Sequence, residues 1–171
     1  MKKIILAVFT SFIFISTIFG QEPETNGDTG TLPKIFEIGM YEASYNQLVS
    51  EYNTLLLGAC DDNMELAYGK WVSMLREMEL FADQVSFDIK GGKFWLNVFF
   101  SPDGNIDYIG YSLKPISRPI EKEELESFLN AFTENFQFPI HISKRFVHYG
   151  SAAFPIMTIP VTIDEIGASD R

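Results

Sequence analysis

The sequence predicts an α+β domain in which a mostly antiparallel sheet of four or five strands carries an N-terminal helix pair and one later helix. Three observations lead to this fold class. Apolar residues recur every three or four positions in three stretches, which is typical of amphipathic helices. Elsewhere they alternate with a period of two, which is typical of strands. Two such runs flank the turn-forming residues 101–105 and predict a central β-hairpin.

The chain begins with the features of a secretory signal peptide. Lys2 and Lys3 precede an apolar run that reaches Phe19 and ends at Gly20. Cleavage after Gly20 leaves a disordered polar leader at 21–33, a single domain at 34–165 and a C-terminal tail at 166–171. The alternative is an uncleaved anchor, because the run is only just shorter than the roughly 18–20 residues that span a bilayer. We expect a bacterial protein that is periplasmic or secreted, with no membrane contact once the signal is removed.

Two helices are expected after the leader, joined by a short connection and therefore packed as an antiparallel pair. Gly58 is predicted to end the first, and Asp62 with Glu65 has the spacing of a capping box at the start of the second. The first has an apolar stripe at Tyr41, Tyr45, Leu48, Tyr52, Leu55 and Leu56. The stripe of the second comprises Met64, Ala67, Trp71, Met74, Leu75, Met78 and Phe81.

A strand is expected at residues 84–89, where the apolar period changes to two. Residues 90–93 then suit a two-residue hairpin loop. In this register Val85, Phe87 and Ile89 lie opposite Val98, Leu96 and Phe94, so that all six share one face of the sheet.

The central hairpin consists of two runs around residues 101–105. A four-residue loop places Ile109, Tyr111 and Leu113 on the same face as the apolar residues of the preceding strand. A three-residue loop with a bulge places Ile106 and Tyr108 there instead, and the first alternative buries more apolar surface. The opposite face carries Trp95 and Phe99, and the N-terminal helix pair is expected to cover it.

The C-terminal part contains one helix and two extended runs. Two prolines make residues 114–119 a connector, and a helix follows at 121–134 with an acidic first turn that matches its dipole. Its stripe is Leu125, Phe128, Leu129 and Phe132. The extended runs are 141–149 and 154–163. Pro155 and Pro160 place the second at a sheet edge or make it irregular.

Charge and residue content argue against several function classes. Removal of Lys2 and Lys3 leaves 11 basic against 23 acidic residues, a net charge near −12, which disfavours binding to nucleic acid. The lone Cys60 excludes an intrachain disulfide and is expected to be packed as a small residue. His141 and His148 point to opposite faces if they share one strand, so no metal site is expected. We expect no cofactor and no enzyme activity.

Parts of the chain resemble the C-terminal domain of TonB-type energy transducers. The resemblance is carried by the hairpin and proline connector at 98–115, by the helix segment at 128–132 and by residues 154–156. It covers roughly residues 94–159 and implies a domain that binds an extended receptor segment by adding it to a sheet edge. The short leader, which contains no long proline-rich spacer, does not fit energy transduction. The resemblance therefore implies an interaction module.

Function is predicted as a non-enzymatic protein-interaction module of the bacterial cell envelope. A partner protein is expected to bind by strand addition or on an aromatic patch. An alternative is a small-molecule binder or enzyme with a pocket near Tyr45, Trp71, Trp95 and Tyr108, and a homodimer is a third. The candidate binding residues are Trp95, Tyr108, His148, Tyr149, Phe154 and Ile156. Phe154 and Ile156 have the alternative role of filling the core.

Overall fold

The computed structural model describes residues 31–157 of the 171-residue chain. The predicted signal peptide, most of the leader and the predicted extended residues after 157 lie outside this range. The described elements follow in the order β1 (Ile35–Glu37), α1 (Glu42–Glu51), β2 (Thr54–Leu55), α2 (Leu56–Ala59), α3 (Met64–Gln84), β3 (Lys93–Phe100), β4 (Ile106–Leu113), α4 (Lys122–Asn135) and β5 (Phe146–Ala153).

The sheet has five strands in the order β1-β4-β3-β5-β2. The central strand β3 pairs antiparallel with β4 and with β5, whereas the two short outer strands pair parallel with their neighbours. The sheet is therefore mixed, and the prediction of a mostly antiparallel sheet was wrong. The α+β class and the number of strands agree with the prediction.

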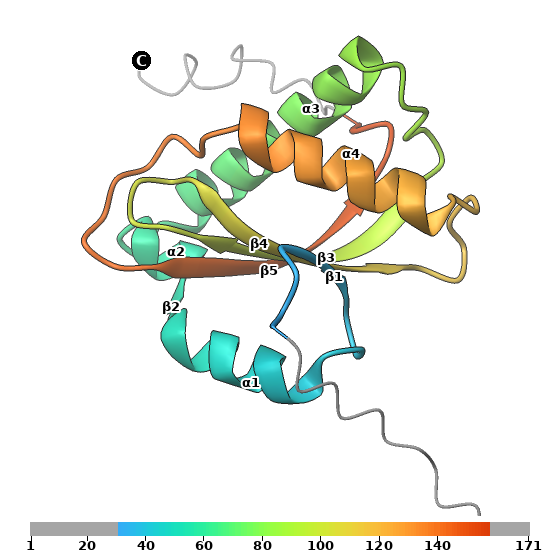
Figure 1. Cartoon of the computed structure of the whole chain (residues 1–171). Coiled ribbons are helices and arrows are strands. Elements are labelled where there is room, and N and C mark those ends of the chain that lie inside the picture. Colours follow the sequence, from blue (N-terminus) through green and yellow to red (C-terminus); the bar gives the residue numbers. More distant parts are fainter. Residues whose placement is uncertain (1–30, 158–171) are drawn as a thin grey trace, which may run out of the picture.

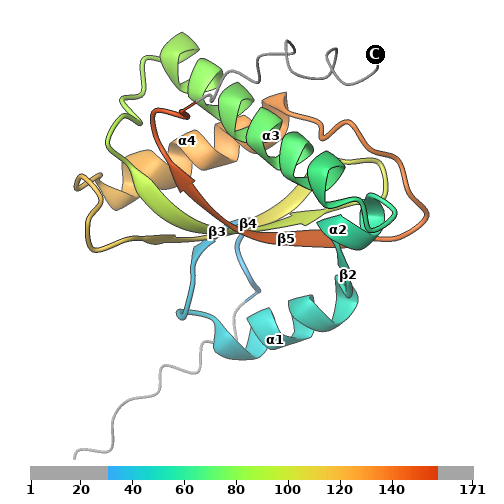
Figure 2. The ribbon, with the colours of Figure 1, turned by 180° about the vertical axis from the view of Figure 1, so that it is seen from behind.

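The helices form two layers, one on each face of the sheet. Figure 1 shows α3 and α4 together above the sheet and α1 alone below it, and the view from behind in Figure 2 shows the same separation. The predicted N-terminal helix pair is thus split between the two faces. After α1 the chain passes along the edge of the sheet as β2 and continues on the other face, so the apolar stripes of α1 and α3 meet opposite faces of the sheet.

The stripe of α1 packs as predicted up to Tyr52. Leu48 and Tyr52 are buried in a small core with Phe36, Phe99 and Val147, and Tyr41 and Tyr45 pack against it. The helix ends at Glu51, and Leu55 lies in β2 and is half exposed. Leu56 lies in α2 and joins the main core on the other face. The predicted stripe wrongly included Leu55 and Leu56, because their spacing continued the helical pattern although β2 follows the end of α1.

The first turn of α3 differs from the prediction. The N-cap is Asn63, whose side chain accepts a hydrogen bond from the Leu66 N–H at 2.9 Å. Asp61 and Asp62 instead have φ of 55° and 59°, a conformation that aspartate tolerates better than most residues. The other members of the predicted stripe pack in or against the main core, but Met64 is 67% exposed.

The predicted strand at 84–89 does not form. Helix α3 continues to Gln84, and the chain turns with φ of 58° at Ser86. Phe87 then stacks on Phe128 of α4 at 4.3 Å, and Ile89 is buried. The alternating apolar residues after α3 therefore do not form a strand, and Phe87 packs against α4 instead. The place beside β3 that this strand was expected to take belongs to β5.

The hairpin of β3 and β4 forms with the preferred register. Phe94, Leu96 and Val98 pair with Leu113, Tyr111 and Ile109, respectively. A bulge follows Phe99 and sets Ile106 opposite Phe100, so Ile106 is buried on this face as well. In the turn, Gly104 has φ of +83°, and a Cβ there would lie 2.1 Å from the Phe138 carbonyl oxygen. Only glycine fits this position.

The helix and the connector predicted for the C-terminal part agree with the structure, and the strand predicted at 141–149 agrees only in part. Helix α4 spans Lys122–Asn135 and buries the four predicted stripe residues. Residues 114–119 form an irregular connector. The predicted strand at 141–149 begins later, because β5 runs from Phe146 to Ala153.

Candidate functional site

The outer edge of β5 is open over most of its length. β2 covers it only at Phe146 and Val147, and no other strand of the described chain pairs with it. At its end, Phe154 exchanges hydrogen bonds with Gly91 and Gly92 on the β3 side. Backbone groups alternate in direction along an antiparallel strand, and the β3–β5 register is continuous. The N–H and C=O groups of Tyr149, Ser151 and Ala153 therefore point away from β3, toward the open edge.

A pocket of about 270 Å³ lies beside this edge on the helix side. Its most exposed apolar side chains are Met64 and Tyr68, each 67% exposed, and Leu55, 51% exposed. The residues that line it come from β2, α2, α3 and β5: Leu55, Leu57, Met64, Ala67, Tyr68, Trp71, His148 and Tyr149. An apolar pocket next to unpaired strand backbone offers the two features used in recognition by strand addition.

Trp71 and His148 form the inner wall of the pocket. Their ring centroids are 4.3 Å apart. The indole lies so close to the backbone of β5 that a Cβ on Gly150 would be 2.7 Å from Trp71 Cζ2. Burial lowers the pKa of His148 to about 4, so the imidazole is neutral near pH 7. It has no hydrogen bond to another described residue.

Two of the predicted binding residues, His148 and Tyr149, meet at this pocket, and both come from β5. The ring of Tyr149 lies on the opposite face of the sheet, 6.3 Å from that of Phe99. Burial, together with the nearby Tyr45, raises the pKa of its hydroxyl.

Trp95 and Tyr108 lie on the α1 side of the sheet, away from the pocket. Trp95 is 54% exposed, and Lys114 Nζ lies 3.9 Å from the centroid of its ring. Tyr108 is partly buried against the small core. Tyr45 belongs to the same face, where its hydroxyl accepts a hydrogen bond from the Asn97 amide at 3.0 Å. Trp71 lies on the opposite face. The structure therefore does not bring Tyr45, Trp71, Trp95 and Tyr108 into one pocket.

Phe154 and Ile156 lie beyond the end of β5. Phe154 is buried with its ring 6.0 Å from that of Phe94. Ile156 packs against the main core, and its N–H donates to Glu79 Oε2 at 3.1 Å. Both positions correspond to the core-filling alternative.

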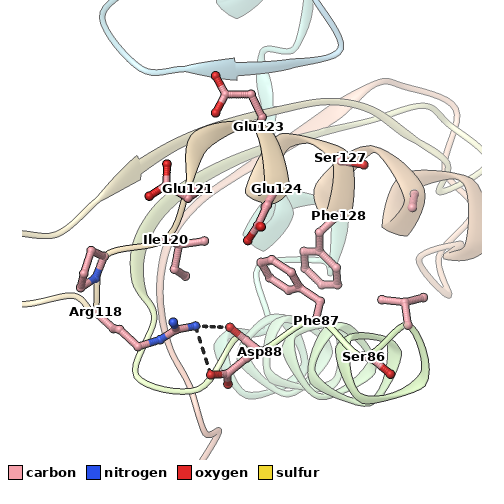
Figure 3. Close-up of a pocket in the computed structure, with 13 residues that line it drawn as sticks. Ser86, Phe87, Asp88, Arg118, Ile120, Glu121, Glu123, Glu124, Ser127 and Phe128 are labelled. Carbon is pink, nitrogen blue, oxygen red and sulfur yellow. Dashed lines mark hydrogen bonds and ion pairs between the residues drawn. The ribbon is translucent and has the colours of Figure 1, made fainter.

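A larger groove, of about 860 Å³, lies between α4 and the turn after α3 (Figure 3). Its apolar residues include Phe87, Phe128 and Ile120, and its charged ones include Glu121, Glu123 and Glu124. Sequence reasoning missed this groove, because it assigned Val85 and Phe87 to a strand and treated the acidic turn only as a partner of the helix dipole. The sequence feature that could have indicated the groove is Phe87, an aromatic residue just after the end of α3.

Two buried tyrosines bind carboxylates outside these sites. Tyr52 donates to Asp107 at 2.7 Å, and Tyr111 donates to Glu126 at 2.8 Å. Burial and these hydrogen bonds raise the pKa of both hydroxyls. In residues 31–157, no three histidine, cysteine, aspartate or glutamate side chains are grouped so that they could hold a metal ion. None of the helices described in that range is long and apolar enough to cross a bilayer.

Comparison with protein-family models, curated proteins and solved structures gives no significant match. Function is therefore inferred from the geometry of these surfaces.

Proposed function

We propose that this protein is an exported interaction module that binds an extended segment of a cell-envelope partner by adding it to the open edge of β5. The observation that carries the proposal is the row of outward backbone groups at Tyr149, Ser151 and Ala153 beside an apolar pocket. Unpaired strand backbone is a ready template for another strand. The role is one of binding rather than catalysis.

The pocket would provide the specificity that main-chain hydrogen bonds lack. Side chains of an added strand alternate between the two faces of the sheet, so every second one would lie on the side of α2 and α3. A large apolar side chain there fits between Tyr68, Met64 and Trp71, and its burial contributes about 1.5–3 kcal/mol. We therefore expect the partner segment to carry a leucine, methionine or aromatic residue at that position.

The resemblance to TonB C-terminal domains supports the same mode of binding, since those domains take up a receptor segment at a sheet edge. The signal-peptide features at residues 1–20 support a partner in the cell envelope. Neither observation identifies the partner.

Selection from a random peptide library displayed on phage tests this proposal with the exported protein as bait. We expect selected peptides to share one apolar position and to slow amide hydrogen exchange in β5. Tyr68→Ser and Met64→Ser should weaken binding about tenfold, which corresponds to the loss of roughly 1.4 kcal/mol of apolar contact. Leu80→Ser is the matched control, since Leu80 is a similarly exposed residue of α3 outside the pocket.

Two results would contradict the proposal. One is a set of peptides that protect another surface and tolerate the pocket substitutions. The other is a stable dimer in light scattering whose β5 edge is already protected, because a second copy would then occupy the edge.

A further inference from the structure

The groove beside α4 has an aromatic floor. Phe87 and Phe128 stack with centroids 4.3 Å apart and an interplanar angle of 12°. Ile120 lies next to them (Figure 3). Val85, which is 48% exposed, also lines the groove. Phe128 is buried and Phe87 is only partly buried, so Phe87 is the ring that the groove presents to apolar side chains of a partner.

Three glutamates of the N-terminal part of α4 give the groove a negative charge. Glu121, Glu123 and Glu124 make no ion pair with any described residue. Lys122, next to them in the chain, is turned to the other side of α4, where it contacts Glu37 at 3.4 Å and Glu126 at 3.9 Å.

Among the described residues, Arg118 is the one cation that lines the groove. Its guanidinium is already engaged by the turn after α3. Its guanidinium contacts Asp88 Oδ2 at 3.4 Å and donates to the backbone oxygens of Asp88 and Lys90. It therefore fixes the turn to the connector and leaves the three glutamates uncompensated.

The helix dipole accounts for only part of this arrangement. Glu123 and Glu124 lie in the first turn of α4, where negative charge is favourable. Glu121 occupies the N-cap position but makes no side-chain capping hydrogen bond. Figure 3 shows Glu124 on the side of α4 that faces Phe87. Neither capping nor the dipole explains why the partly exposed Phe87 lies beside the Glu124 carboxylate.

We propose that this groove binds a basic segment of a partner protein, with lysine or arginine at the glutamates and an aromatic or aliphatic side chain against Phe87 and Val85. Charge complementarity selects this occupant, since an acidic or neutral segment would leave the rim unpaired. The net charge of −10 favours encounter with basic partners in the same way. This surface is separate from the β5 edge, and the inference does not depend on strand addition.

A short fluorescein-labelled peptide with alternating lysine and phenylalanine is the probe, and fluorescence anisotropy gives its affinity. The Glu121→Gln/Glu123→Gln/Glu124→Gln variant should weaken binding at least about tenfold. Glu42→Gln/Glu65→Gln/Glu134→Gln is the matched control, because it removes the same charge at exposed positions outside the groove. Val85→Ser tests the apolar lining at a half-exposed position and should weaken binding severalfold.

Amide chemical shifts in a titration should locate the probe at Phe87 and residues 120–128, and raising the salt from about 0.05 to 0.3 M should weaken its binding. Equal weakening in the two triple variants would overturn the proposal, because it would show attraction to net charge alone. Unchanged binding after Val85→Ser, or by a peptide with serine in place of phenylalanine, would overturn the apolar part. Loss of binding in Ser151→Pro, with the groove variants unaffected, would place the probe at the β5 edge and overturn the groove assignment.

Discussion

Gly150 determines how closely Trp71 approaches β5. A Cβ at this position would lie 2.7 Å from Trp71 Cζ2 and 2.9 Å from His148 Nε2. We expect Gly150→Ala to displace the indole and to lower the free energy of unfolding by about 1–3 kcal/mol. Urea unfolding followed by circular dichroism measures this change.

Gly69 of α3 provides the control for that substitution. A Cβ there meets nothing within 4 Å, and alanine is the better helix former, so Gly69→Ala should stabilise the protein by about 0.5–1 kcal/mol. A Gly150→Ala variant as stable as the wild type would show that the Trp71 contact is not tight.

His148 should make stability depend on pH in a defined window. Burial lowers its pKa from 6.5 to about 4, so the unfolded chain takes up the proton first as the pH falls. The contribution of neutral His148 to the free energy of unfolding is complete above about pH 6.5, and it is lost progressively as the pH falls toward 4. Between about pH 7 and 5, the wild type should lose roughly 2 kcal/mol more than His148→Leu in urea unfolding. Equal losses in the two proteins would contradict this role of His148.

For single residues, the sequence predicts burial more reliably than it predicts which side chains are in contact. The spacing of Trp71 in α3 correctly placed it in a packed stripe. Its contact with His148 depends on how α3 crosses β5, and no local pattern encodes that crossing. The cap at Asn63 was missed for a related reason, since Asp62 and Asn63 are both good capping residues and only the positive φ of Asp62 separates them.

Helices and strands that were indicated by two independent sequence features were predicted correctly. The β3–β4 hairpin combines strand alternation with a strong turn, and α4 combines an apolar stripe with a preceding proline connector. The segment at 84–89 had alternation alone. Its apolar side chains found partners on α4 instead of β3, and alternation by itself cannot distinguish these two environments.

Substitution of adjacent residues in β5 by proline tests the direction of its backbone groups. Ala152 N–H points to β3, so Ala152→Pro should break the ladder and cost about 3 kcal/mol or more. Ser151 N–H points to the open edge, where proline is tolerated, so Ser151→Pro should cost on the order of 1 kcal/mol. Thermal unfolding of the two variants measures the difference. Similar destabilisation by both would mean that the Ser151 N–H is also bonded within the fold.

For the whole molecule, the arrangement of the helices on the two faces was beyond sequence reasoning. The outer strands β1 and β2 are only three and two residues long, too short to leave a periodic signal. β2 nevertheless decides that α1 lies on one face and α3 on the other. The pocket at the β5 edge depends on this crossing, because its lining comes from β2, α2, α3 and β5. The sequence identified His148 and Tyr149 as candidates, but not the side chains that surround them.

Pairing of a partner segment with the outward backbone of β5 requires the Ser151 N–H, so the decisive measurement is the affinity of Ser151→Pro for a selected peptide. This variant should fold and lose most of its affinity, whereas Ser151→Thr, which keeps the N–H, should bind like the wild type. Undiminished binding by a folded Ser151→Pro variant would contradict strand addition at this edge.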